Sequence, residues 1–466
     1  MSDPTPKQAY ETPDEDRAAS AAPTEPQLER EMPGGHEVAG HDPYAALRHR
    51  RYVIYMIAFF ISVIASQMET FTATYEIFKK TESTMSLGLV GLVLGIPMLL
   101  LTLPAGHLAD TRSRRRMIVV TQSFCAVCLV GLSMLSHYGH AWPHSIGAMY
   151  LLLSLSAAGA TIGRPARAAL MPQLVPQAVF SNAVTWNSST FETATVLGPT
   201  IAGFICAKSI PSAYFVAAIG FAICAVLMAT LPETHDASAK RRSATLSDVS
   251  VGLRFVWRAK LMLGAMTMDL FAVLLGGAVF LLPAVATDIL HVGPIALAWL
   301  RAGPSIGAIS MALILAHRPP MRRAGRALLL SVAGFGVATV IFGLSRNFWL
   351  SFVMLILTGA FDNISVVVRH TIVQMLTPDE MRGRVSAVNQ IFIGSSNEIG
   401  GFESGVTAAW LGTVRSIVFG GIGTLLVVTV CSLVFPAVRT LGSLQDIKPA
   451  ARPTEPENPS PAPTTT

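Results

Sequence analysis

Long apolar runs, separated by short polar breaks, occupy most of this chain. A helix needs about 20 mainly apolar residues to cross a bilayer, and twelve runs of about that length follow one another. Because the breaks are short, we expect consecutive helices to be antiparallel neighbours. The pattern predicts an all-α membrane protein whose transmembrane helices cover residues 52–76, 86–108, 116–137, 146–166, 182–207, 213–231, 261–286, 295–316, 327–344, 348–373, 385–410 and 414–438.

A polar segment after the sixth run divides the helices into two sets of six. Between Leu246 and Lys260 it carries apolar positions at helical spacing beside basic residues. This pattern fits a short amphipathic helix on the membrane surface and an ordinary linker helix equally well. Both chain ends are rich in Pro, as expected for disordered tails. The predicted regions are a tail over 1–45, a bundle over 50–231, a linker over 232–260, a bundle over 261–438 and a tail over 439–466.

The composition agrees with a lipid-facing surface. Hydrophobic residues make up 52% of the chain and charged residues only 13%, whereas a soluble domain carries about 25% charge. Basic residues gather in alternate polar breaks, as they do in cytoplasmic loops. With both termini cytoplasmic, the opposite side holds few basic residues, namely Lys79, Lys80, Lys208, Arg346 and Arg415. This asymmetry also explains the net charge of +6 without a nucleic-acid partner.

The two halves of the chain match at a constant offset of 202 residues. Such a six-plus-six duplication is typical of transporters in which two pseudo-symmetric bundles enclose a substrate site near the membrane midplane. The matched pairs are Arg167 with Arg369, Leu174 with Leu376, Pro176 with Pro378, Asn187 with Asn389, Gly198 with Gly400, Gly203 with Gly405, and Val90–Gly91 with Val292–Gly293.

The segment from Gly106 to Arg116 follows the second predicted helix and contains a Gly, an Asp four residues later and a basic cluster. It is similar to the loop between helices 2 and 3 of the major facilitator superfamily, although Thr111 and Ser113 depart from that pattern. An aspartate at this place would accept charge-assisted hydrogen bonds from arginines. The resemblance implies a conformational lock on the cytoplasmic side, formed by Gly106, Asp110, Arg114, Arg115, Arg167 and Arg369, with a specific hydrogen bond from Arg167 to Asp110.

Within that superfamily the chain resembles the branch of drug and siderophore exporters. The resemblance rests on Ser66–Thr70, Pro165–Arg167, Leu174–Pro176, Leu281–Pro283 and Pro378–Val385. Helix 5 also carries a segment similar to the Gly-Pro-rich motif of exporters, with Gly198, Pro199 and Gly203. Gly and Pro bend a helix and let a partner approach closely. The resemblance implies the major facilitator fold and favours export.

Ionisable residues inside predicted spans are functional candidates, because each costs about 2.5–3.5 kcal/mol to insert. Glu69 and Asp269 lie in helices 1 and 7, which line the central cavity in this superfamily, and a structural pairing is the alternative role for both. The repeat offset aligns Asp269 with Gln67. Asp362 and Arg369 lie two turns apart in helix 10, and we expect them to form a structural ion pair. The residues predicted for substrate binding or proton coupling are Glu69, Asp269, Gln67, Glu192, Asn187, Asn389 and Glu398, and Met68, Phe71, Phe271 and Gln390 are further predicted lining residues.

The sequence contains no phosphate-binding loop ending in Gly-Lys-Ser/Thr and no motif of a hydrolase or metal enzyme. Cys125 and Cys128 form an isolated CxxC inside an apolar run, where packing is the simpler role. We therefore expect a secondary transporter in the bacterial inner membrane, without cofactor, metal or enzymatic activity. It would act as a monomer in the lipid bilayer and exchange a small molecule for protons. The alternatives are an importer or facilitator of the same fold, and a membrane receptor or assembly subunit that transports nothing.

Overall fold

The computed structural model describes residues 42–139, 145–233, 246–318, 321–378 and 381–443. Most of both predicted tails and the centre of the predicted linker, residues 234–245, lie outside the described residues. The described residues from Ala46 onward belong to one compact unit. Its described residues form helices and no strands.

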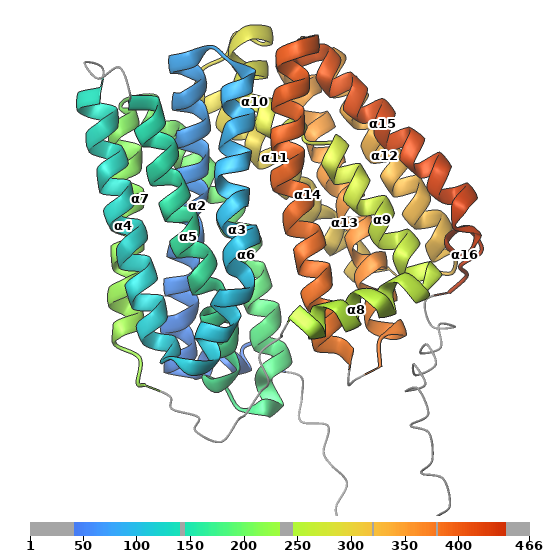
Figure 1. Cartoon of the computed structure of the whole chain (residues 1–466), viewed down its shortest axis with the longest axis horizontal. Helices are drawn as coiled ribbons and strands as arrows, with labels where there is room; N and C mark the ends of the chain where they lie inside the picture. Colours follow the sequence, from blue (N-terminus) through green and yellow to red (C-terminus); the bar gives the residue numbers. More distant parts are fainter. Residues whose placement is uncertain (1–41, 140–144, 234–245, 319–320, 379–380, 444–466) are drawn as a thin grey trace, which may run out of the picture. The chain divides into compact units, whose positions relative to one another are not determined.

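The first six long helices make one bundle, drawn in blue to green in Figure 1. Their apolar faces meet in a core that includes Phe71, Leu132 and Tyr214. Short 3-10 turns flank this bundle, η2 (Ala45–Arg48), η4 (Met171–Gln173) and η5 (Gln177–Val179). The helices are α2 (Arg50–Thr81), α3 (Thr84–Thr111), α4 (Arg114–Tyr138), α5 (Ser145–Leu170), α6 (Phe180–Cys206) and α7 (Ile210–Ala229).

The remaining long helices make a second bundle, drawn in yellow-green to red (Figure 1). Its first spanning segment is broken into the four pieces α9 (Lys260–Leu275), η6 (Ala278–Leu281), α10 (Leu282–Ala284) and the π-helix η7 (Val285–Ile289). The other helices are α11 (Pro294–Ala316), α12 (Ala324–Leu344), α13 (Phe348–Leu376), α14 (Arg382–Leu411), α15 (Thr413–Val434) and the short α16 (Pro436–Arg439).

Ten segments in the described part of the chain are long and apolar enough to cross a membrane. They include the broken segment Lys260–Ile289, counted as one. Helices α6 and α14 match them in length, at 27 and 30 residues, but lack a stretch that is apolar enough to count among these ten. Both helices take part in the interface between the bundles, so polar side chains on them need not face lipid.

The predicted span over 261–286 is interrupted at Gly276 and Gly277. At each glycine a neighbouring helix comes so close that a Cβ would clash, with the Phe335 ring at Gly276 and the Gly400 carbonyl at Gly277. Sequence periodicity could not show this break, because every residue around it is apolar or small. Broken helices of this kind free backbone carbonyls at membrane depth, where they serve binding sites.

Helix α8 (Leu246–Arg258) follows the linker and lies across one end of the second bundle (Figure 1). Phe255 and Val256 are buried against α9 and α14, and Gly252 contacts the backbone at Arg384. The predicted amphipathic helix is therefore present, and its apolar face packs on protein. Trp257 remains 64% exposed.

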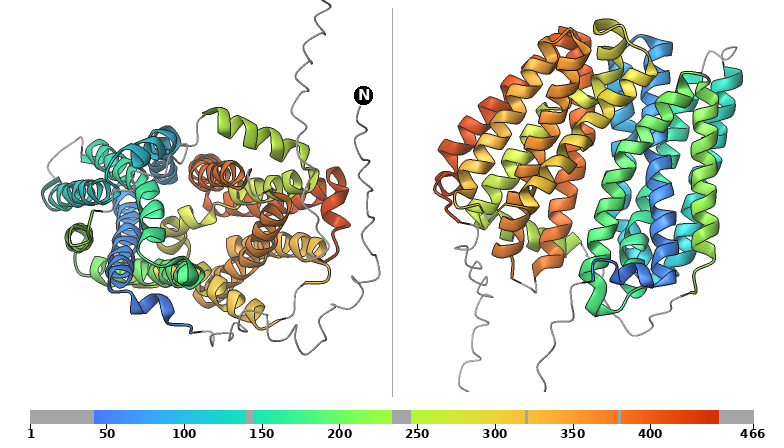
Figure 2. Two further views of the ribbon diagram at one scale, coloured as in Figure 1. Left: turned by 90° about the horizontal axis from the view of Figure 1, so that it is seen from below. Right: turned by 180° about the vertical axis from the view of Figure 1, so that it is seen from behind.

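Consecutive long helices run antiparallel between the two ends of the bundles. We call the end at which α2 begins the basal end, and the end at which α2 finishes the distal end. Close contacts between the bundles lie between the midpoint and the distal end: Gly91 of α3 meets the backbone at Glu398 and Phe402 of α14, and Gly203 of α6 meets Pro294 of α11. Toward the basal end the two bundles diverge (Figure 2).

Candidate functional site

A cavity of about 830 Å³ lies between the two bundles. Six elements of the first bundle and six of the second contribute to its wall, so neither half of the chain forms the site alone. The polar and charged lining residues are Tyr55, Ser62, Ser66, Gln67, Thr70, Gln122, Arg164, Arg167, Asn187, Arg301, Thr339, Thr358, Asp362, Asn397 and Glu398. Aromatic lining residues include Phe59, Phe191, Phe280 and Phe335.

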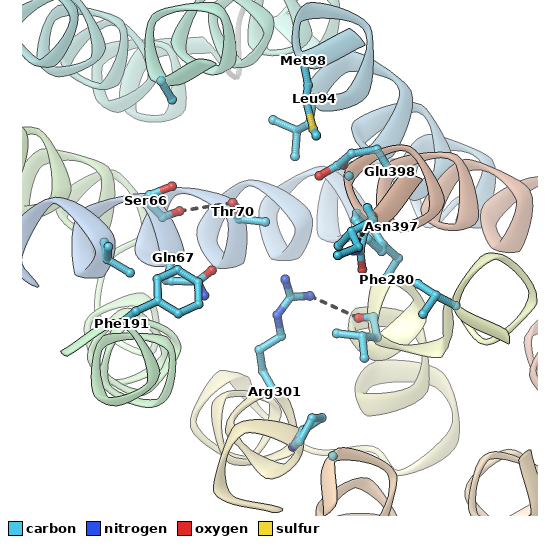
Figure 3. Close-up of a pocket in the computed structure, with 18 of the residues that line it drawn as sticks. Ser66, Gln67, Thr70, Leu94, Met98, Phe191, Phe280, Arg301, Asn397 and Glu398 are labelled. Atoms are coloured by element: carbon cyan, nitrogen blue, oxygen red, sulfur yellow. Dashed lines mark hydrogen bonds between the residues drawn. The ribbon is translucent and has the colours of Figure 1, made fainter. Parts of the chain in front are cut away.

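Arg301 of α11 reaches into the centre of this cavity (Figure 3). Its Nη1 donates a hydrogen bond of 3.2 Å to the carbonyl of Val279, which lies just past the break in the α9 segment. The broken helix thus supplies the acceptor that orients the guanidinium. An oriented arginine in a partly dry site is suited to bind an acidic group of a ligand.

Glu398 of α14 lies within electrostatic range of Arg301 and of Arg164 from the first bundle. Its Oε2 is buried and has no hydrogen-bond partner among the described residues. Gly95 of α3 makes room for it, because a Cβ at that position would lie 2.8 Å from the Glu398 Cβ. The carboxylate is held at the seam between the bundles, where relative movement of the bundles would change its neighbours.

The lining carries three arginines, Arg164, Arg167 and Arg301, against the two carboxyl groups Asp362 and Glu398. The charges therefore sum to 3 − 2 = +1. Together with the aromatic side chains, this excess suits a ligand that combines an acidic group with an apolar part.

Several predicted site residues lie in the cavity wall. Gln67, Asn187 and Glu398 were predicted for substrate or proton binding, Arg167 for gating and Asp362 for a structural ion pair, and all five line the cavity. Asn187 Oδ1 is buried and lacks a partner within the described residues. Their position in the wall agrees with a binding role, which remains a prediction.

Other predicted residues lie elsewhere. Glu69 is 7% exposed inside the first bundle, and Asn389 is 6% exposed within α14. Glu192 of α6 is outside the lining, although it lies within electrostatic range of Asp362. Met68 and Phe71 belong to the buried core, and Phe271 is exposed away from the cavity. The side chain of Gln390 lies outside the described part of the structure.

The ion pair of Arg369 differs from the prediction. Arg369 pairs with Asp269 of α9, and Asp362 does not take part. Seven residues along a helix correspond to about 10.5 Å, which is too far for Asp362 to reach Arg369, whereas α9 packs directly beside α13. Both partners are buried, with side-chain exposures of 4% and 8%. Asp269 and Asp362 share the wall of a small void next to this pair.

Arg167 occupies the equivalent place in the first bundle. Its Nη1 donates to Ser62 Oγ at 3.1 Å, and Ser62 Oγ donates to Gln122 Oε1 at 3.2 Å. The two predicted repeat partners thus each bind a side chain on the first long helix of their own bundle, Arg167 with Ser62 of α2 and Arg369 with Asp269 of α9. The pair Val90–Gly91 and Val292–Gly293 occupies different places in the two bundles, because the first lies inside α3 and the second precedes α11.

The predicted cytoplasmic lock is not engaged in this structure. Asp110 is exposed and forms no hydrogen bond or ion pair with any described residue, and the expected bond from Arg167 is absent. No atom lies within 4 Å of the Cβ position at Gly106. Arg114 instead donates to the carbonyl of Ala169 at 3.1 Å. Arg115 lies beside it at the start of α4. The basal ends of the bundles are apart, so the lock has no surface to close against.

The Gly-Pro segment of α6 does mediate close packing. A Cβ at Gly198 would lie 3.1 Å from the carbonyl of Ile64 in α2, and Gly203 contacts α11 of the other bundle. Pro199 is buried between them. The segment therefore joins α6 to both bundles at once.

Arg164 and Arg301 are the main cavity residues that the sequence analysis did not assign. A signal was present for each, because Arg164 lies one turn before Arg167 and Arg301 is an ionisable residue inside a predicted span. Among the described residues, no group of three His, Cys, Asp or Glu side chains could hold a metal ion. All five cysteines are buried free thiols.

Comparison with known proteins identifies the family. The family model described as transmembrane secretion effector matches residues 41–458. The chain belongs to the transmembrane secretion effector family of the major facilitator superfamily. Members of this family are multi-pass membrane transporters, so the helices of the two bundles are membrane helices.

This family member is 26% identical over 392 residues to the enterobactin exporter EntS of Shigella boydii serotype 18. The match covers 84% of this chain and 93% of the relative. The same identity and coverage hold for EntS of Escherichia coli O139:H28.

Solved structures share the fold. The nucleoside transporter NupG matches with a TM-score of 0.65 at 14% identity, over 83% of this chain and all of the neighbour. A bacterial homologue of the human lysosomal transporter Spinster matches with a TM-score of 0.63 at 15% identity, over 86% of this chain and all of the neighbour. A D-xylose–proton symporter matches with a TM-score of 0.63 at 12% identity, over 84% of this chain and 99% of the neighbour.

Proposed function

We propose that this chain exports a small organic compound across the bacterial inner membrane in exchange for protons. The observation that carries the proposal is the cavity between the bundles, with Arg301 and Glu398 on one side and Arg164 on the other. A ligand bound there touches both halves of the chain. Movement of one half against the other would carry it from one side of the membrane to the other.

The direction of export is supported by the relatives and by the Gly-Pro segment of α6. The relatives named above are exporters of enterobactin, a siderophore. A substrate with an acidic group and an aromatic part fits the arginines and phenylalanines of this cavity. We propose a siderophore, drug or metabolite of this chemical type as the substrate.

The topology that we propose has twelve crossings with both termini in the cytoplasm. Ten crossings meet the length and apolarity expected of membrane spans, and α6 and α14 supply the other two. The basal end carries most of the basic residues at helix ends, among them Arg50, Arg114 and Lys260. By the positive-inside rule this end faces the cytoplasm. The structure then corresponds to a state that opens inward.

Transport into everted membrane vesicles tests the proposal. Enterobactin serves as the first probe, because the relatives are named for it. We expect a proton gradient to drive uptake into everted vesicles, an uncoupler to abolish it, and Arg301→Gln to weaken it by about tenfold or more. Arg415→Gln is the matched control, since Arg415 is exposed at the distal end of α15.

The alternatives give different results in the same system. Uptake into right-side-out vesicles would indicate an importer, and equilibration independent of the gradient would indicate a facilitator. A non-transporting receptor would move no compound in either direction, and deletion of its gene would leave the composition of the culture medium unchanged.

A further inference from the structure

One face of α2 carries three buried polar residues at a spacing of seven. Ser62, Glu69 and Glu76 are 2%, 7% and 2% exposed. Seven residues are nearly two full turns, so the three side chains share one face and follow one another at intervals of about 10.5 Å. Glu69 and Glu76 point into the first bundle, whereas Ser62 lies in the wall of the central cavity.

Glu76 lies at the distal end of this row and lines a surface pocket of about 500 Å³. Its Oε1 forms an ion pair with Lys80 and accepts a hydrogen bond from Ser136 Oγ, both at 2.7 Å. Its Oε2 is buried and has no hydrogen-bond partner in the described part of the chain. Lys79, His137 and Lys208 also line the pocket, which opens at the distal surface.

Tyr214 of α7 faces the row from a neighbouring helix. Its hydroxyl lies beside Glu76 and within electrostatic range of Glu69, and it is buried without a hydrogen-bond partner among the described residues. Ser156 of α5 lies beside Glu69. The Ser156 hydroxyl and Glu69 Oε1 are also buried and unpartnered within the described residues. Four unpartnered polar atoms thus cluster along one face of α2.

Ser62 ends the row at the central cavity. Its hydroxyl is hydrogen-bonded to Gln122 and Arg167, and all three residues line the cavity wall. The row therefore reaches from a pocket at the distal surface to the site where we place the substrate.

A purely structural role explains only part of this row. Lys80 balances the charge of Glu76, but no described cation forms an ion pair with Glu69. Charged groups face the two ends of the row, Arg167 at Ser62 and the lysines of the distal pocket at Glu76. The titratable groups that interact with Glu69 are thiols and a phenol, which are neutral at physiological pH: Cys125 and Cys128 of α4 and Tyr214 of α7. An unpaired carboxyl in the interior of a membrane bundle is a functional candidate.

We infer that this row is the route by which protons pass from the distal surface to the central cavity. A proton enters through the distal pocket and binds Glu76 Oε2. It passes through the Tyr214 hydroxyl, which accepts one proton as it releases another, to the Glu69 carboxylate. Glu69 then releases it at the Ser62 end of the row, where the Ser62 hydroxyl accepts one proton as it releases another to water in the cavity. Each group returns to its starting state, and one proton has moved. This route rests on the proposed exchange of substrate for protons.

Carbodiimide labelling tests the route without any substrate. A hydrophobic carbodiimide adds to protonated carboxyl groups, and mass spectrometry of the peptide reports its addition to Glu69. In right-side-out vesicles the distal end faces the medium. Acidifying that medium should increase labelling of Glu69 in the native chain, and Glu76→Gln and Tyr214→Phe should slow this response by about tenfold or more.

Matched controls are available in the same part of the chain. Glu82→Gln and Tyr138→Phe change exposed residues near the distal end that are not in the row, and both should label as the native chain does. In everted vesicles, acidifying the medium should still increase the labelling of Glu69 in Glu76→Gln, because protons then reach Glu69 from the cavity. Circular dichroism establishes that each variant is folded, and Tyr214→Phe keeps the buried ring.

The route is wrong if Glu69 is never labelled, or if Glu76→Gln and Tyr214→Phe respond to the outer pH as fast as the native chain. Failure of the proposed function has a different signature. If labelling follows the prediction but proteoliposomes exchange no enterobactin and no culture-medium compound depends on the gene, the route stands and the export proposal falls.

Discussion

Replacing Arg369 by glutamine leaves Asp269 without its partner in the interior of the second bundle. The two side chains are only 4% and 8% exposed, so water cannot take the place of the guanidinium. Breaking a buried pair by removing one partner costs about 3–5 kcal/mol. We therefore expect Arg369→Gln to lower the free energy of unfolding by about that amount, which is more than about 100-fold in the unfolding equilibrium constant.

The double variant Asp269→Asn/Arg369→Gln separates this effect from lost packing. Removing both charges leaves no uncompensated charge, and such replacements are often close to neutral. We expect the double variant to recover at least half of the loss. Unfolding in mixed micelles with a rising fraction of SDS, followed by circular dichroism, measures all three free energies. Arg415→Gln, at an exposed position, controls for the loss of a positive charge.

Additive effects of the two substitutions would refute this reasoning. In that case the proximity of Arg369 and Asp269 would carry no coupling energy, and the buried pair would not stabilise the second bundle.

Three further substitutions have clear expected outcomes. Gly91→Leu cannot fit against the α14 backbone, where even a Cβ would lie 2.9 Å from the Glu398 carbonyl oxygen, so it should open the distal contact between the bundles. A cysteine placed at Thr70 should then react with an impermeant maleimide from the distal side. In the control Gly147→Leu, where a Cβ meets no atom within 4 Å, the same cysteine should stay protected. Arg301→Lys keeps the charge but loses the planar fork that binds an acidic group, so enterobactin transport should fall by raising KM. Asp110→Asn should leave the unfolding free energy within about 0.5 kcal/mol of the native value, since its carboxylate is exposed and unpaired with any described residue in this state; a larger loss would mean that the lock is engaged.

The helical architecture could be predicted from the sequence because it depends on local pattern. Apolar runs that are long enough to cross a bilayer are expected to form helices. The observed helices begin and end near the predicted residues. The break at Gly276 and Gly277 could not be predicted. It depends on Phe335 and Gly400, which are distant in sequence and reach these glycines only after the bundle has formed.

The candidate site could be predicted in part, because the polar residues inside predicted membrane helices can be read from the sequence. Gln67, Asn187 and Glu398 are polar residues on helices that meet between the bundles, and they do line the cavity. Sequence spacing does not reveal which face of a helix points to the cavity, so Glu69 was grouped with Gln67 although their side chains point to different regions. The partner of Arg369 depended on the packing of α9 against α13, which no pattern within either helix encodes.

Distances between spin labels on the two bundles test the central claim most directly. One pair, His107 of α3 with Gly383 of α14, reports the basal end, and a second pair, Glu82 with Trp410, reports the distal end; all four positions are exposed. Acidic medium or enterobactin should lengthen the distal distance and shorten the basal distance together, as alternate opening of one cavity requires. If both distances stay fixed, or both lengthen under every condition, the two bundles do not alternate around the cavity and the transport mechanism is wrong.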